Sequence, residues 1–500
     1  MAPHAIPPAP ALGDPLADRP LSGTSGGRAD ALDALRGFAI LTMALSGLVP
    51  WGTLPAWMYH AQFPPPACKF NPAVAGLTWV DLVFPFFLFA LGAALPLALD
   101  RRRRDGTPGW SLALHAWQRG LLLAFFALYV EQVRPHRLSS SPGAAQFWAA
   151  LALFVPLFPL LARLPRHWPR WRHVATRLVG WSACVGFLIW QHRAAEDLKW
   201  LRQFDIIIVV LANMAFFGTL LWLLTADRLP LRIALLVGLV AVRLGASADG
   251  WVKVLWDGTW LPLPLREYVN AYTQLWYLQY LHIVLPGTIA GELLLRWLHA
   301  PPGPAPTRGA LLRAAALAVL CAGLIVWLLV GLQSRWVQLT PLVAAAACGA
   351  GALLVLSPRG ALEHLLRGLY GWAVLWLLIG LVLEPYEGGI KKDRATLSYY
   401  YVTSGLAGCA LLLFTVLIEG YGVRRPLYLL IASGQNPMIA YAGSHNLMRP
   451  LVELTGLQAL AAAWLKGQSP WLGVLWAAAR TVLLAALTSI FTRLRVFWRT

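Results

Sequence analysis

The sequence predicts an all-α protein, a polytopic bundle of about 12–14 transmembrane helices. Of its 500 residues, 58% are hydrophobic and only 13% are charged, and the mean hydropathy is +0.60. A soluble domain of this size does not need so much apolar surface. The apolar residues form unbroken runs of roughly 17–25 residues, which is the length of a spanning helix, and they lack the alternation of a transmembrane β-barrel.

Fourteen apolar segments are candidate spans. Inside lipid the backbone polar groups must bond within the protein, which requires these segments to be helical. We place them at residues 32–50, 78–100, 110–132, 145–164, 177–192, 205–226, 231–247, 272–297, 310–333, 339–357, 367–384, 396–418, 427–447 and 470–492. The segments 231–247 and 427–447 are the weakest, because the first is short and the second carries polar residues.

The basic residues lie mostly between these segments. A net charge of +19 is compatible with nucleic-acid binding, but the clustering of Lys and Arg between spans is the positive-inside pattern of a membrane protein. Its strongest feature is the run Arg101–Arg104 after the second span. The pattern argues against a nucleic-acid partner and predicts that both termini are cytoplasmic and that the 51–77 loop lies outside. Three arginines, Arg119, Arg243 and Arg480, fall within spans.

The chain divides into a short tail and one membrane domain. Residues 1–28 are rich in Pro, Ala and Gly and lack the apolar core of a signal peptide, so we expect a disordered cytoplasmic tail. Residues 29–500 form a single transmembrane domain. The cysteines lie far apart without metal-ligand spacing, which predicts neither a metal site nor a disulfide framework. They are Cys68, Cys184, Cys321, Cys348 and Cys409.

A histidine and an aspartate flank the start of the second span. His60 lies in a Pro-rich loop, and histidine is the side chain best suited to proton transfer near neutral pH. Asp81 lies at the N-terminus of the following helix, where a carboxylate gains from the helix dipole. Two interpretations stay open for each residue. His60 is either a solvated loop residue or a catalytic base, and Asp81 either caps the helix or orients His60.

Three other groups have both a structural and a functional interpretation. Asp33 and Arg36 share one face of the first span, where they form an interfacial ion pair or part of a polar pocket. Lys391 and Lys392 lie in a predicted outer loop, where lysines usually extend to lipid headgroups. The glycines of GTIAGE (287–292) are most typical of close helix packing. No P-loop, HExxH, GxSxG or Rossmann motif is present, which argues against ATP hydrolysis.

The segment 433–446, SGQNPMIAYAGSHN, is unusually polar for a span. Five of its side chains can hydrogen-bond and cannot all face lipid without partners. They are Gln435, Asn436, Ser444, His445 and Asn446. Either these residues line a cavity or the helix breaks near Pro437, and we favour a polar cavity.

Six motifs give the chain a family resemblance. They are DALRGFAILTM (33–43), YHA (59–61), GLTWVDLVFPFFLFALG (76–92), LPGTIAGE (285–292), KKDRATLSYYYVTSGLA (391–407) and GQNPMIAY (434–441). The chain resembles the heparan-α-glucosaminide N-acetyltransferase family, which comprises membrane acetyltransferases of lysosomes and bacterial homologues. The resemblance implies transfer of an acetyl group from acetyl-CoA to an amino sugar or glycan, here on the periplasmic side of a bacterial inner membrane.

The resemblance also assigns roles. The family uses a histidine in the loop before the VDLVFP-like helix, which corresponds to His60 as general base or transient acetyl carrier, with Asp81 in support. Independently of the resemblance, the chemistry of acyl transfer needs donors for the developing oxyanion, for which Asn436 and Lys391 are candidates. The candidate substrate-binding residues are Asp33, Arg36, Lys391, Lys392, Gln435 and Asn436. The CoA phosphates have four candidate ligands, Arg101, Arg102, Arg103 and Arg104, for which a topology signal is an equal alternative.

The expected partners are membrane lipids and the sugar acceptor, with a homodimer as the candidate assembly. The chain departs from the family pattern between His60 and Gly76, where FPPPACKFNP is inserted. If this insertion holds His60 away from Asp81, the two residues act separately. A different class of function also fits the polar 433–446 segment, namely a transporter or flippase for a sugar or lipid-linked glycan.

Overall fold

The computed structural model describes residues 29–195, 197–263, 265–301 and 304–499. The predicted tail 1–28 lies outside the described residues. The all-α class is confirmed, because β-pairing in the described part of the chain is limited to one antiparallel bridge between Ala162 and Trp498.

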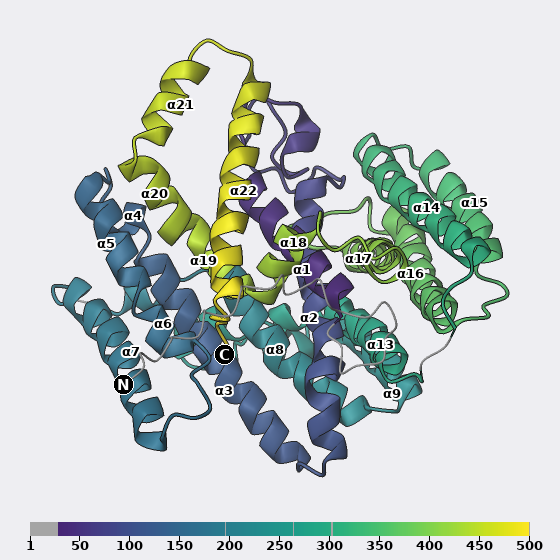
Figure 1. Cartoon of the computed structure of the whole chain (residues 1–500), viewed down its shortest axis with the longest axis horizontal. Coiled ribbons are helices and arrows are strands. Elements are labelled where there is room, and N and C mark those ends of the chain that lie inside the picture. Colours follow the sequence, from purple (N-terminus) through teal and green to yellow (C-terminus); the bar gives the residue numbers. More distant parts are fainter. Residues whose placement is uncertain (1–28, 196, 264, 302–303, 500) are drawn as a thin grey trace, which may run out of the picture.

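The helices follow one another with short connections (Figure 1). In chain order they are α1 (Asp30–Ser46), η1 (Ala56–Met58), α2 (Trp79–Arg104), α3 (Gly109–Gln132), α4 (Pro135–Leu138), α5 (Ala144–Phe154), α6 (Leu157–Leu161), α7 (Arg170–Gln191), η2 (Lys199–Arg202), α8 (Ile206–Thr225), α9 (Leu229–Gly245), α10 (Trp251–Trp256), α11 (Leu265–Tyr272), α12 (Leu275–Leu278), α13 (Leu281–Leu298), α14 (Arg308–Gln333), α15 (Leu339–Leu354), α16 (Ala361–Tyr386), α17 (Leu397–Thr415), η3 (Val416–Gly420), α18 (Tyr428–Gln435), α19 (Pro437–Gly443), η4 (Ser444–Met448), α20 (Arg449–Leu454), α21 (Leu457–Leu465) and α22 (Pro470–Arg493).

Among the described residues, ten helical segments are long and apolar enough to cross a membrane. The fourteen predicted spans all fall on helices, but four of them are too short for this criterion. The helices α1 and α9 have 17 residues each and α15 has 16, and the 427–447 segment is broken into pieces. Both of the weakest predicted spans are among these four.

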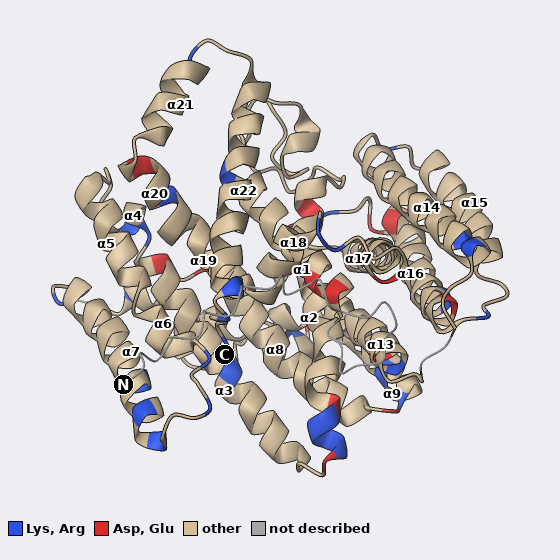
Figure 2. Cartoon of the chain, viewed as in Figure 1, with Lys and Arg blue, Asp and Glu red and all other residues tan. Residues whose placement is uncertain are grey.

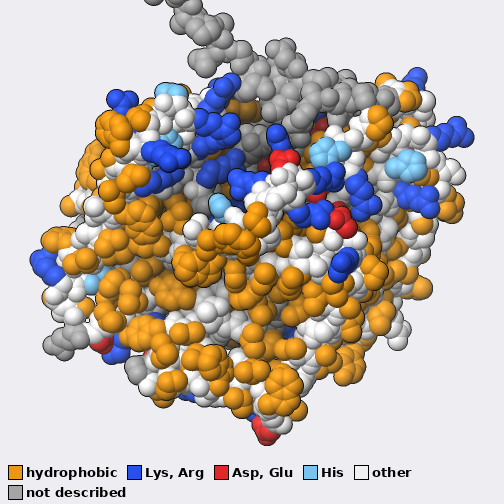
Figure 3. Space-filling view, turned by 90° about the horizontal axis from the view of Figure 1, so that it is seen from below, with side chains coloured by type: hydrophobic (Ala, Val, Ile, Leu, Met, Phe, Trp, Pro, Cys, Tyr) orange, Lys and Arg blue, Asp and Glu red, His pale blue; other side chains and the backbone are white. Residues whose placement is uncertain are grey.

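The outer surface of the bundle is apolar. Figure 3 shows broad areas of hydrophobic side chains, with Lys and Arg gathered mainly in the upper half of that view. Large hydrophobic side chains are exposed on several helices, such as Trp171 on α7, Val319 on α14 and Leu342 on α15. Exposed apolar surface on this scale requires a lipid environment. The protein is therefore a multi-pass membrane protein.

Helix α17 lies at the centre of the fold. It is seen end-on in Figure 1, and it packs against α16, α14, α13, α1 and α2. The segment Leu397–Gly420 is the most enclosed of the ten, with 89% of an apolar stretch of 18 residues buried inside the protein. Polar side chains on α17 bond within the protein, and Tyr399 Oη donates to the Asp81 carbonyl at 2.9 Å. This contact connects the central helix to the start of α2.

Glycines bring two helix pairs into backbone contact. A Cβ added at Gly37 of α1 would lie 1.9 Å from Leu430 O of α18, and one at Gly434 would lie 1.8 Å from Asp33 O. The glycines of the 287–292 motif, on α13, pack in the same way on α2. A Cβ at Gly287 would lie 2.2 Å from a backbone oxygen of that helix. The packing interpretation of this motif is confirmed.

The predicted 427–447 span is both broken and cavity-lining. Helix α18 ends at Gln435, Pro437 begins α19, and a π-helical turn, η4, follows from Ser444. Proline has no backbone N–H and fixes its own φ, so it begins a helix readily but does not continue one. Asn436 fills the break with φ −125° and ψ 56°. The two alternatives left open by the sequence therefore hold together.

Most charged residues lie at helix ends or in the connections between helices (Figure 2). The run Arg101–Arg104 closes α2, and acids at the same end bind part of it. Arg103 Nη2 lies 2.7 Å from Asp227 Oδ2, and Arg104 Nε lies 2.7 Å from Asp100 Oδ2. The cysteines are all unpaired, and Cys68 alone is partly exposed while the other four are buried.

Candidate functional site

His60 is held at the mouth of α2 by its own loop. The neighbouring side chain, Tyr59, is buried, and its hydroxyl donates to Pro50 O at 2.7 Å and accepts from Leu54 N at 2.9 Å. Thr78, the residue before α2, donates its hydroxyl to Tyr59 O at 2.7 Å. These bonds fix the backbone on both sides of His60 and leave its imidazole 34% exposed.

The structure brings His60 and Asp81 together. His60 Nδ1 lies 2.8 Å from Asp81 Oδ1, and the carboxylate is 2% exposed. The second oxygen, Oδ2, accepts from the backbone N–H groups of Ala61 and Thr78, each at 3.1 Å. The two roles considered for Asp81 are thus divided between its oxygens. Oδ2 caps the helix and the loop, and Oδ1 contacts the imidazole. An ionised carboxylate only accepts, so Nδ1 carries the hydrogen and Nε2 is the acceptor nitrogen.

The FPPPACKFNP insertion does not separate this pair. It folds back on itself as a lobe, because Asn71 N donates to Gln62 O at 2.9 Å and Phe63 N donates to His60 O at 2.9 Å. Phe63 then packs between Trp51, in an edge-to-face contact, and Phe70, with ring centroids 5.9 and 5.6 Å away. Most of the extra residues are exposed, and the chain then leads to Thr78, the capping residue of α2.

A lysine from a distant segment completes this group. Lys392 Nζ lies 3.1 Å from His60 Nδ1 and 3.4 Å from Nε2. Since Nδ1 donates to Asp81, the ammonium group can donate only to Nε2. The Lys392 segment is clipped to the His60 loop by Gln62, whose amide bonds the backbone N–H and C=O of Asp393. Of the two candidate lysines, Lys392 contacts His60, and Lys391 bonds through its backbone to Thr396.

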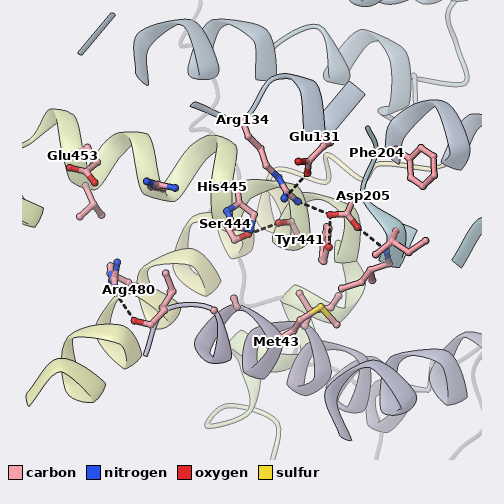
Figure 4. A pocket seen from close by; sticks show the side chains of 18 of the residues that line it. Met43, Glu131, Arg134, Phe204, Asp205, Tyr441, Ser444, His445, Glu453 and Arg480 are labelled. Atoms are coloured by element: carbon pink, nitrogen blue, oxygen red, sulfur yellow. Dashed lines mark hydrogen bonds and ion pairs between the residues drawn. The ribbon is translucent and has the colours of Figure 1, made fainter. Parts of the chain in front are cut away.

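A second polar region lies away from His60. It surrounds a cavity of about 590 Å³, here called the large cavity, between the end of α1, the end of α3, the start of α8, and the α19–α21 and α22 segments. This volume is within the usual range for small-molecule sites. Figure 4 shows Arg134, Glu131, Asp205, Tyr441, Ser444 and His445 on one side, with Glu453 and Arg480 on another. His60 is not among its lining residues.

One wall of the large cavity is an ion-pair network. Arg134 bridges Glu131 and Asp205, with both N–O distances at 2.6 Å, and Tyr441 Oη donates to Asp205 Oδ2 at 2.7 Å. Asp205 also caps α8 by accepting from Ile207 N at 3.0 Å. All three charged side chains are largely buried. The sequence analysis did not identify this network, since bonded partners such as Asp205 and Tyr441 lie 236 residues apart.

A smaller cavity of about 240 Å³, the arginine cavity, adjoins the large one. Arg36, Arg119 and Arg499 line it together with Gln435 and many apolar side chains of α2, α3 and α8. Arg119 lies close enough to Arg36 and Arg499 to interact with both electrostatically. The two cavities share four lining residues, which form the partition between them. These are Ile40, Met43, Ile207 and Tyr441.

Of the other site residues predicted from the sequence, Asp33, Arg36 and Gln435 lie at the arginine cavity, and Asn436 does not. Arg36 Nη1 bonds Asp33 Oδ1 and Gly434 O, each at 3.1 Å, so the predicted ion pair exists at the edge of the arginine cavity. Asn436 lies elsewhere. It is completely buried, and its amide bonds Val496 O at 2.7 Å and Trp498 N at 3.2 Å, so it holds the C-terminal segment and cannot serve as an oxyanion donor in this conformation.

One feature of the sequence could have indicated the cavities, namely the three arginines that fall within predicted spans. Charged groups at membrane depth face a cavity or a partner, because lipid does not solvate them. Arg119 lines the arginine cavity and Arg480 lines the large one. The third, Arg243, bonds Gln279 Oε1 at 2.6 Å inside the bundle.

Comparison with known proteins gives one family. No curated protein matches the chain. The model of a family described as a domain of unknown function, DUF5009, matches residues 28–294. The matched part includes α1, the His60 loop, α2 and the residues of α1, α3 and α8 that line the large cavity. This match covers more than half of the chain. The protein therefore belongs to the DUF5009 family.

Proposed function

We propose that this protein is a membrane acyltransferase that moves an acetyl group from acetyl-CoA to an amino sugar or glycan on the periplasmic side of a bacterial inner membrane. The observation that carries the proposal is the 2.8 Å contact between His60 Nδ1 and the buried Asp81 carboxylate. A buried carboxylate that fixes the tautomer of a partly exposed imidazole is the arrangement of a general base. The motif series that resembles the acetyltransferase family gives His60 the same role.

The chemistry that follows needs few groups. His60 Nε2 accepts the proton of the acceptor amine or hydroxyl as the new bond to the acetyl carbon forms. The carbon–sulfur bond then breaks, and the proton passes to the sulfur of the departing CoA. Lys392, whose ammonium lies 3.4 Å from Nε2, is the donor best placed for the oxyanion that develops, and it must turn from Nε2 to the carbonyl oxygen when the substrates bind, which frees the Nε2 lone pair. It takes this role in place of the sequence-based candidates Lys391 and Asn436.

The arginine cavity supports the choice of donor substrate. A CoA ester combines several phosphates with a long arm, and the cavity combines three guanidinium groups with apolar walls. Ala98 of α2 lines the cavity, and the candidate phosphate ligands Arg101–Arg104 begin three residues further on. Arg36, Arg103 and Arg104 each pair with an acid, but Arg36 and Arg119 line the cavity itself, which makes these two the stronger candidates.

The test is acetyl transfer from labelled acetyl-CoA to glucosamine by the purified full chain in proteoliposomes. His60→Ala should lower the rate by roughly 10²–10⁴-fold, which is the usual contribution of a general base. His364→Ala, on the exposed face of α16, is the matched control and should leave the rate unchanged. Equal rates for wild type and His60→Ala would remove His60 from the mechanism.

Kinetics distinguish the two roles of His60. If Nε2 carries the acetyl group itself, acetyl-CoA and acceptor react in separate half-reactions with ping-pong kinetics. If Nε2 acts only as a base, both substrates must be bound together and the pattern is sequential. Trapping of a labelled acetyl group on the protein in the absence of acceptor supports the carrier role.

One observation favours a second function, transport of a sugar or lipid-linked glycan. The two adjoining cavities follow α1 from Arg36 to Leu48, with only four side chains between them. Such a series of cavities is also what a substrate path through a bundle requires. Uptake of labelled sugar into proteoliposomes without acetyl-CoA, and without acetylated product, would favour transport over acyl transfer.

A further inference from the structure

The large cavity has a second wall whose charges are only partly used by the fold. This wall comprises Arg449 and Glu453 on α20 and Arg480 on α22. In the described part of the chain, no hydrogen bond or ion pair holds the Arg449 guanidinium. Arg480 Nη2 donates to Leu48 O at 3.0 Å, and its Nε is buried with no partner among the described residues.

The charges of this wall do not cancel. Arg480 interacts electrostatically with both Arg449 and Glu453, so two guanidinium groups lie near one carboxylate. On the opposite wall the acids are already satisfied. Glu131 contacts Arg134 and also Arg137 Nε at 2.9 Å, and Asp205 contacts Arg134 and Tyr441. Three arginines and three acids line the cavity, but the two acids of the opposite wall are bound by Arg134 and by Arg137 outside the lining, which leaves an excess of one positive charge on the wall of Arg449 and Arg480.

The geometry of the wall indicates a ligand with several anionic oxygens. Two arginines on different helices can each approach a different edge of a tetrahedral phosphate, whereas one guanidinium suffices for a carboxylate. Groups that can bond hydroxyls complete the lining, namely Tyr441, Ser444 and Gln458. The volume of about 590 Å³ leaves room for a saccharide beside the phosphate.

We propose that the large cavity is a binding site for an organic phosphate, with Arg449 and Arg480 as the ligands of the phosphate group. The ligand is either a water-soluble sugar phosphate or the phosphate headgroup of a lipid. The assignment goes beyond the proposed acetyl transfer, since His60 does not line this cavity and binding is measurable without acetyl-CoA.

The first experiment compares glucose 1-phosphate with glucose, each titrated against the full chain in detergent by calorimetry. Glucose 1-phosphate should bind at least tenfold more tightly. Arg449→Gln and Arg480→Gln should each weaken its binding at least tenfold, and Arg367→Gln, an exposed arginine of α16, should have no effect. Equal binding of the two sugars by the wild type, with no phosphatidate binding in the second experiment, would overturn the proposal even if a variant failed to fold.

The second experiment distinguishes the two sources of phosphate. The protein is placed in nanodiscs with phosphatidate or with phosphatidylcholine alone, and both glucose 1-phosphate binding and the phosphatidate retained by the protein are measured. Phosphatidate retention that Arg449→Gln lowers, with displacement of glucose 1-phosphate in the wild type, assigns the site to a lipid headgroup, and glucose 1-phosphate binding unaffected by phosphatidate assigns it to a soluble sugar phosphate. The proposal is wrong if neither glucose 1-phosphate nor phosphatidate responds to Arg449→Gln or Arg480→Gln.

Discussion

The His60 group and the large cavity are built in opposite ways. His60 lies on a loop, and one buried carboxylate and one lysine contact its partly exposed ring. The large cavity is enclosed by several helices, and its strongest charges bind one another. The first region has an imidazole in close contact with a buried carboxylate, and the second has an enclosed volume of about 590 Å³. Bond-making and ligand-holding are thus assigned to different parts of the molecule, and substitutions should separate them.

The largest expected effect on stability is at the cavity network. Arg134→Met leaves the Glu131 and Asp205 carboxylates buried without their shared cation, which should lower the free energy of unfolding by about 3–5 kcal/mol. Unfolding in mixed micelles followed by circular dichroism measures the change. Arg202→Met breaks the exposed pair with Glu267 and should change stability by less than about 1 kcal/mol. Similar losses in the two variants would contradict the difference between buried and exposed pairs.

The next effect should appear mainly in catalysis, with a smaller loss of stability because Asp81 also caps the helix and the loop. Asp81→Asn keeps the size of the side chain but no longer fixes the His60 tautomer, so acetyl transfer should fall roughly 10–100-fold. As a positioning residue, Asp81 should affect kcat and leave KM for acetyl-CoA nearly unchanged. Asp249→Asn, at an exposed pair, is the control. A change in KM alone would mean that Asp81 acts on substrate binding.

The smallest expected effect is at the clip between the two loops. Gln62→Ala removes two hydrogen bonds to the Asp393 backbone, each with a net contribution of about 0.5–1.5 kcal/mol. The Lys392 segment should loosen, with acetyl transfer reduced by less than about tenfold. Hydrogen exchange of the 390–396 backbone measures the loosening. A loss of activity as large as that of Asp81→Asn would show that Lys392 is as important to the rate as the carboxylate.

The sequence predicted the parts of the molecule that depend on local pattern. Every predicted span falls on a helix, because long apolar runs have few alternatives in lipid. The contact of His60 with Asp81 could also be predicted as one alternative, since Asp81 lies in the first turn of the helix that follows the His60 loop. Whether the insertion allowed this contact was not predictable, because it depends on the Gln62–Asn71 closure.

The large cavity could not be derived from one sequence. Arg134, Asp205 and Tyr441 each resemble an ordinary residue at a helix end or in an apolar turn, and only the packing of α3, α8 and α19 brings them together. The role of oxyanion donor that the sequence suggested for Asn436 does not fit the structure, for a related reason. Its polarity correctly indicated a broken helix, but its partners, at Val496 and Trp498, come from the other end of the domain.

The lobe that carries the insertion gives the native protein a built-in probe of membrane sidedness. Cys68, within that lobe, is the one partly exposed cysteine, and the other four are buried. A maleimide that cannot cross the bilayer should therefore label intact cells at a single position if the His60 loop faces the medium or periplasm, and only broken cells if it faces the cytoplasm. One labelling experiment on the unmodified chain thus reports on which side of the membrane an acceptor would have to meet His60.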